Sequence, residues 1–118
     1  MAKHIKKYYD KPENKLRNST CALIRHSLHG HKHGYVDTYL SMLDFTIPQL
    51  MRHYESLWVD DMNWGNYGAS IDDWCSDHII AITKFNITSP SCDDFKQCWA
   101  LSNLQPLWVL DNHFKYNF

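Results

Sequence analysis

WCSDHIIAI, residues 74–82, decides how this chain is interpreted, because the polar side chains of Ser76, Asp77 and His78 lie here within an otherwise apolar run. Its aromatic and β-branched residues are typical of a strand. Asp77 and His78 are adjacent, and consecutive side chains of a strand point to opposite faces. One of them could therefore hold a cation while the other accepts a proton, which are the two needs of phosphodiester hydrolysis.

TIPQLMRHYESLW, residues 46–58, predicts a helix. Thr46 and Gln49 form a T-x-x-Q capping box. Pro48 lies in the first turn, where its missing N–H costs no hydrogen bond. The apolar residues that follow recur with a period of 3.6, so one side of this helix is expected to pack on the core.

Shorter signals complete an α+β chain of one domain, since 118 residues bury one modest core. Each has a boundary residue or a periodicity that favours one type of element. The expected elements are a helix from Ser19 to Gly30, a helix over 93–101 capped by Ser91, a strand or turn over 103–107, and a final helix over 108–117.

The charge is divided unevenly along the chain, although the net charge is −1. Residues 1–36 hold eight lysines and arginines against two acids, and the remainder holds four against eleven. We interpret residues 1–18 as a basic flexible arm, because Pro12 and Asn14 discourage a continuous helix, and residues 19–118 as the domain. Such a chain could meet a polyanion at one end and hold a cation at the other; a merely solvated tail is the alternative.

Several classes of protein are disfavoured. No apolar run approaches the ~20 residues that span a bilayer, and the first residues lack the apolar stretch of a signal peptide, so a soluble cytoplasmic protein without membrane contact is expected. The four cysteines include no CxxC pair and are expected to be free core residues. His29, His31 and His33 are interpreted as part of a polar loop, with metal binding as the alternative.

Five ordered segments between about residues 43 and 117 resemble the HNH endonuclease family, particularly its small phage-type and homing members. They are TIPQLMRHYESLW, MNWGNYG, W-x-x-DHII, NLQPLW and DN-x-x-K. The resemblance implies the ββα-metal fold, in which two short antiparallel strands and a helix clamp one divalent ion, here over about residues 74–117 with additional N-terminal helices. Trp64, Asn66 and Tyr67 of the second segment are expected to pack beneath the site rather than touch substrate.

The resemblance also implies roles for individual residues. Asp77 corresponds to the first metal ligand and His78 to the general base that activates water. Asn103 corresponds to the residue that orients the histidine and its loop. Asn112 corresponds to the second protein ligand of the metal, and His113 is a possible substitute because many family members carry His at that position.

The implied cofactor is one divalent metal ion. A carboxylate and an amide oxygen are hard ligands that suit Mg²⁺, with Mn²⁺ or another divalent ion as alternatives. Double-stranded DNA is the implied partner, and Lys115 could face its phosphate. Basic side chains nearer the start are expected to hold the duplex through salt-sensitive contacts; these are Lys6, Lys7, Lys15, Arg17 and Arg25.

The resulting expectation is a metal-dependent endonuclease, of phage or mobile-element type by resemblance, that hydrolyses DNA phosphodiester bonds. One metal site cuts one strand at a time, so a double-strand break would need a dimer or two successive events. If His78 is the base, activity should rise with pH through its pKa. One alternative is a non-catalytic DNA-binding accessory protein, for example in phage DNA packaging. In another, Asp77 is only a capping or ion-pairing residue and His78 a hydrogen-bonded core histidine.

Overall fold

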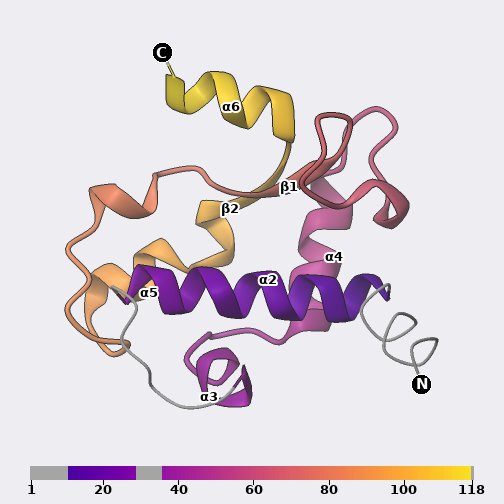
Figure 1. Ribbon diagram of the computed structural model, residues 1–118. Coiled ribbons are helices and arrows are strands. Elements are labelled where there is room, and N and C mark those ends of the chain that lie inside the picture. The colour runs from indigo at the N-terminus through magenta and orange to yellow at the C-terminus, as the bar shows by residue number, and fades with distance from the viewer. Residues whose placement is uncertain (1–10, 29–35, 118) are drawn as a thin grey trace.

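The computed structural model describes residues 11–28 and 36–117, and the expected α+β class is confirmed (Figure 1). Within these ranges five α-helices surround a two-stranded antiparallel sheet. In chain order the elements are α2 (Pro12–Ser27), α3 (Val36–Leu40), α4 (Ile47–Leu57), β1 (Trp74–His78), α5 (Asp93–Cys98), β2 (Leu104–Trp108) and α6 (Val109–Asn117). The three histidines of the predicted polar loop, His29, His31 and His33, lie outside the described residues.

Helix α2 begins at Pro12, seven residues before the start expected at Ser19. Pro12 occupies the first turn, where its fixed φ favours the helix and its missing N–H has no intrahelical partner. Leu16 is 0% exposed and extends the buried face that continues through Ile24. Residues 12–18 are therefore part of the folded body, which corrects the expectation of a flexible arm for this stretch.

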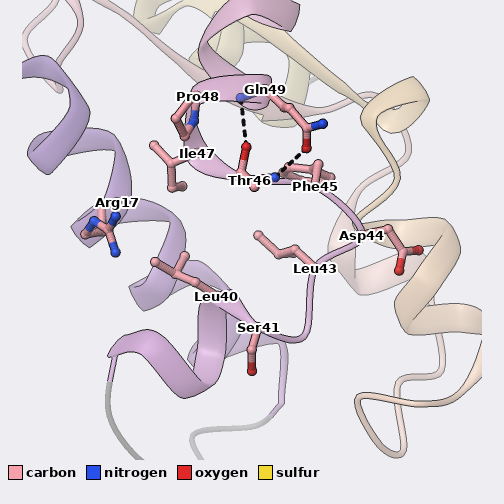
Figure 2. A pocket seen from close by; sticks show the side chains of 10 residues that line it. All are labelled: Arg17, Leu40, Ser41, Leu43, Asp44, Phe45, Thr46, Ile47, Pro48 and Gln49. Atoms are coloured by element: carbon pink, nitrogen blue, oxygen red, sulfur yellow. Dashed lines mark hydrogen bonds between the residues drawn. The ribbon is translucent and has the colours of Figure 1, made fainter.

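The capping box predicted for α4 is confirmed. The hydroxyl of Thr46 accepts a hydrogen bond from the backbone N–H of Gln49 at 3.2 Å, and the Gln49 side chain accepts one from the N–H of Thr46 at 2.7 Å (Figure 2). The start of α4, the end of α3 and Arg17 of α2 surround a cavity of about 510 Å³. The start of α4 therefore lies close to α2.

Trp74, the first residue of β1, is fully buried in a cluster of aromatic rings. The ring of Tyr54 in α4 packs edge-on against that of Trp74, with ring centroids 5.6 Å apart. The ring centroids of Trp64 and Tyr67 lie 5.2 and 4.8 Å from that of Trp74. The side chain of Asn66 accepts a hydrogen bond within the same segment. Packing was the role expected of Trp64, Asn66 and Tyr67, and these contacts agree with it.

Strand β1 ends at His78, four residues before the end expected at Ile82. The backbone N–H and C=O of Ile80 bind the side chain of Asn103 instead of a neighbouring strand. Ile79 and Ile80 are consequently exposed, at 48% and 52%, rather than alternating across a sheet. The loop that follows His78 is thus held by an amide side chain.

The two strands pair in an antiparallel register, and the last helix follows the second strand directly. The register pairs Asp77 with Gln105 and His78 with Leu104. Helix α6 follows β2 without a loop and lies above α2 in the view of Figure 1. The expected final strand and helix are both present.

Helix α5 is shorter than expected and is capped by Cys92 rather than Ser91, because the Cys92 sulfur accepts from the N–H of Phe95. Phe95, Cys98 and Trp99 are buried, as their spacing predicted. All four cysteines are free, and Cys21 and Cys98 are buried. Among the described helices, none combines the length and the hydropathy that crossing a membrane requires.

Candidate functional site

The end of β1, the loop after it and α6 enclose a cavity of about 290 Å³, which Leu23 of α2 closes on a further side. Asp77, His78 and Asn112 all line this cavity. These residues come from two segments more than thirty positions apart, so the fold gathers three of the four side chains that the sequence pointed to. Asn103, the fourth, lies behind the loop and not in the cavity wall.

Asp77 is 2% exposed, and two donors fix its carboxylate. Gln105, directly opposite it in the sheet, donates to Oδ2 at 2.8 Å, and the Lys115 ammonium donates to the same oxygen at 2.8 Å. A buried carboxylate is tolerated only with such partners, because desolvation of an unpaired charge is costly. The orientation of Asp77 is therefore set by β2 and α6 together.

His78 is 5% exposed and packs edge-on against Trp99, with ring centroids 4.5 Å apart. Burial lowers the pKa of His78 to about 4; the Asp77 carboxylate opposes this shift and the Lys115 ammonium adds to it. The imidazole is therefore neutral at neutral pH and able to accept a proton. Its Nε2 is buried and makes no hydrogen bond to any residue in the described ranges.

Asn103 fastens the loop that follows His78. Its Oδ1 accepts from the N–H of Ile80 at 2.8 Å, and its Nδ2 donates to the carbonyls of Ile80 and Cys98 at 3.1 and 2.9 Å. The backbone carbonyl of Asn103 also accepts from the N–H of Ile79 at 2.8 Å. The buried side chain of Asn103 thus links the loop after β1 to the end of α5.

Asn112 and His113 were alternatives for the third site position, and only Asn112 lines the cavity. Its Nδ2 contacts the sulfur of Cys75 at 3.4 Å, and its Oδ1 is buried without a hydrogen-bond partner in the described part of the chain. Burial raises the pKa of Cys75, so this neighbour is a neutral thiol. His113 is exposed, with its ring beside that of Phe114.

The donor set of the cavity fits a hard divalent cation. A buried amide oxygen that lacks a hydrogen bond would be satisfied by a cation, and the carboxylate of Asp77 lines the same space. Mg²⁺ binds few protein oxygens and keeps several waters, for which a cavity of this size has room. Within residues 11–28 and 36–117, no three His, Cys, Asp or Glu side chains gather into a metal-binding cluster. The fit therefore depends on Asp77 and Asn112.

The sequence did not predict the contacts that Lys115 and Gln105 make with Asp77. Lys115 was expected to face a phosphate, but its ammonium lies against Asp77 and the carbonyls of His78 and Ile79. Gln105 is absent from the predicted site, although pairing NLQPL against WCSDH in antiparallel register would have placed it opposite Asp77. The register was the missing information.

The basic residues expected to bind DNA are spread over different surfaces. Lys15 lines a cavity of about 700 Å³ that adjoins the site through Leu23 and Ser76. Arg17 lines the separate cavity at the start of α4 (Figure 2), and Arg25 is exposed in the last turn of α2. Lys6 and Lys7 lie outside the described residues. Of the described three, Lys15 is the one beside the site.

No protein-family model, curated protein or solved structure matches this chain. What the chain does must therefore be inferred from the chemistry of its cavity.

Proposed function

We propose that this protein is a metal-dependent endonuclease of the HNH type, which hydrolyses phosphodiester bonds of double-stranded DNA. One observation carries the proposal: a carboxylate, a neutral imidazole and an amide oxygen line a single cavity, and the imidazole and amide each have a buried atom without a hydrogen bond to the described residues. Over residues 74–117 the antiparallel strands β1 and β2, with α5 between them in the chain, are followed directly by α6, and the pairing of the strands with a helix after them supports the proposed ββα arrangement.

His78 is the general base in this proposal. A neutral imidazole beside the scissile phosphate accepts a proton from the attacking water, a contribution that typically accelerates such reactions by about 10²–10⁴. Asp77 and Asn112 would hold one divalent ion, Mg²⁺ or Mn²⁺, through their oxygens. When bound, the ion supplies positive charge that stabilises the phosphate and its leaving oxygen.

Residues outside the cavity wall would support this chemistry by fixing the groups within it. Asn103 holds the loop after His78 through two side-chain hydrogen bonds with Ile80 and ties it to α5 through a third with Cys98, and so restricts where the backbone beside the histidine can move. Gln105 holds Asp77 from the neighbouring strand. Hydrogen bonds to a ligating carboxylate orient it and tune its basicity, so their removal is expected to weaken metal binding or rate.

The alternative is a purely structural role for Asp77 and His78. It requires that Asp77 form an ion pair, and Asp77 does so with Lys115. It also requires a hydrogen-bonded core histidine, whereas Nε2 of His78 is buried without a partner in the described ranges. Leaving such an atom unpaired costs about 1–3 kcal/mol. That cost has an explanation if the imidazole meets water and substrate.

A supercoiled-plasmid assay tests the proposal. The protein is incubated with plasmid and Mg²⁺, Mn²⁺ or EDTA, beside the variants His78→Ala and His26→Ala. His26 is an exposed histidine of α2 and serves as the matched control. We expect nicked or linear product with either metal, none with EDTA, none with His78→Ala, and an unchanged rate with His26→Ala.

The same assay identifies the competing function. If no metal supports cleavage while the plasmid is still retarded on a gel, the protein binds DNA without cutting it and the accessory role replaces the nuclease. Cleavage that persists in His78→Ala would show that another group is the base. Product formed equally in EDTA would contradict the metal requirement.

A further inference from the structure

Helix α6 carries Asn112, yet two of its large apolar side chains are exposed rather than buried against the body. Leu110 and Phe114 are 42% and 47% exposed. In globular proteins most helical stability comes from burial of an apolar face, and a helix of nine residues is marginal alone. Other contacts must therefore hold α6 in the position where Asn112 reaches the cavity.

Those contacts are polar and lie just before the start of β1 and at its end. The N–H of Val109 donates to the carbonyl of Asp73 at 2.8 Å at the start of the helix. Near its end, the Lys115 ammonium donates to Oδ2 of Asp77 at 2.8 Å and to the carbonyls of His78 and Ile79 at 2.8 and 3.3 Å. An ammonium has three N–H donors, and here three oxygens face it.

We propose that Lys115 is a positioning residue, which docks α6 on the end of β1 and thereby places Asn112 at the cavity. Asn112 and Lys115 are three residues apart, so they lie on the same side of the helix. Leu110 and Phe114 lie on the other side, in solvent. Docking at Lys115 consequently turns Asn112 toward Cys75 and the cavity wall.

The docking is independent of the proposed function, whereas its consequence for metal binding rests on it. The side chain of Asp77 is 1% exposed and favours a cation at this point, whereas that of Lys115 is 31% exposed; hydrogen bonds between an ammonium and a carboxylate are stronger than neutral ones. Arg would not be equivalent, because its planar fork cannot direct three N–H groups at three converging oxygens.

Hydrogen–deuterium exchange of the full chain, without metal or DNA, tests the docking. In Lys115→Met we expect amide exchange over residues 109–117 to rise about tenfold or more, since charge-assisted hydrogen bonds are removed. Exchange over α4 should not change. Lys96→Met, which alters an exposed lysine of α5, is the matched control and should leave α6 unchanged. Wild-type exchange of α6 in Lys115→Met would overturn the proposal.

Lys115→Arg keeps the test decisive if Lys115→Met does not fold. The arginine retains the charge but not the three-point geometry, so exchange over residues 109–117 should lie above that of the wild type. Exchange equal to that of the wild type would show that charge alone suffices, and would overturn the role of the three hydrogen bonds.

Calorimetric titration with Mn²⁺ tests whether Lys115 acts through Asn112. We expect Lys115→Met and Asn112→Ala each to weaken Mn²⁺ binding, and the double variant to bind no more weakly than Asn112→Ala alone. Tighter binding in Lys115→Met would mean that the lysine only repels the ion, which contradicts positioning. If the wild type binds no Mn²⁺, the metal site of the proposed function fails, while the exchange experiment still decides the docking.

Discussion

Burial of His78 determines the protonation state of the proposed base. An exposed histidine releases its proton near pH 6.5, whereas the desolvated ring of His78, edge-on to Trp99, does so at a pKa of about 4. Nothing in the sequence indicates this shift, because it arises from residues that only the fold brings around the ring. It changes where the pH dependence of activity should be sought.

Protonation of His78 is not expected to change the rate of cleavage between about pH 5.5 and 8. The rate should fall only as the pH approaches 4. The imidazole is already neutral above its lowered pKa, so raising the pH creates no further base. Initial rates of plasmid nicking at constant ionic strength and saturating Mg²⁺ would show this. A sigmoidal rise centred near pH 6.5 would mean that His78 is exposed to water when it acts, contrary to its burial.

Stability should fall as the pH is lowered from about 6.5 to 4. In this window the unfolded chain binds a proton at His78 and the folded chain does not, so the folded state is disfavoured as the pH falls. Once the pH is below both pKa values of His78, the free energy of unfolding has decreased by on the order of 3 kcal/mol. Urea unfolding of the wild type and of His78→Leu at pH 7 and 4.5 should show a larger decrease for the wild type; equal decreases would contradict the lowered pKa.

For single helices and strands, the sequence was sufficient to predict a boundary where the contacts that set this boundary are local. The capping box of Thr46 and Gln49 fixed the start of α4 because both partners lie within one turn. The predicted start of α2 is too late, because a proline that breaks a helix interior favours a helix when it stands in the first turn, as Pro12 does. The predicted end of β1 is too late, because Asn103, 23 residues beyond Ile80, binds the backbone there.

Thr46→Ala should destabilise the protein by about 1 kcal/mol, since it leaves an N-terminal N–H of α4 without its acceptor. The change is best measured as a shift in the urea midpoint followed by far-ultraviolet circular dichroism. Ser102→Ala, at an exposed position in the short turn before β2, is the matched control and should have little effect. Equal midpoints for Thr46→Ala and the wild type would show that the cap contributes nothing to stability.

Part of the candidate site could be predicted from the sequence as individual residues, but its geometry could not. Asp77, His78 and Asn112 were singled out by their motifs, and they line one cavity. The lysine that pairs with Asp77 was assigned to a phosphate, because spacing along α6 shows which residues share a side and not what that side faces. Long-range partners of this kind depend on the register of β1 and β2.

For the molecule as a whole, the fold changes how the basic N-terminal region should be tested. Removing residues 1–18 would also remove Leu16, which is fully buried, and so would confound DNA binding with unfolding. Removing residues 2–10 takes away Lys3, Lys6 and Lys7 and leaves α2 intact.

We expect this shorter deletion to weaken DNA binding and to reduce the slope of log K against log salt by roughly 0.9 for each phosphate that the shortened chain no longer neutralises. Fluorescence anisotropy with a labelled duplex, measured over a range of NaCl concentrations, gives both quantities. Amide exchange over α2 in the truncated chain should match that in the full chain. An affinity and a salt slope that both stay unchanged would show that these lysines do not touch the duplex.

The pairing of β1 with β2 has a consequence for how fast the site forms during folding. Residues 79–103 separate the two strands in the chain. Pairing β1 with β2 therefore costs more chain entropy than forming a tight hairpin. Contacts between residues far apart in sequence slow folding, whereas α2 and α4 can form locally. We expect refolding followed by pulsed hydrogen exchange to protect the amides of α2 and α4 before those of β1, so that the chain becomes helical before its cavity exists.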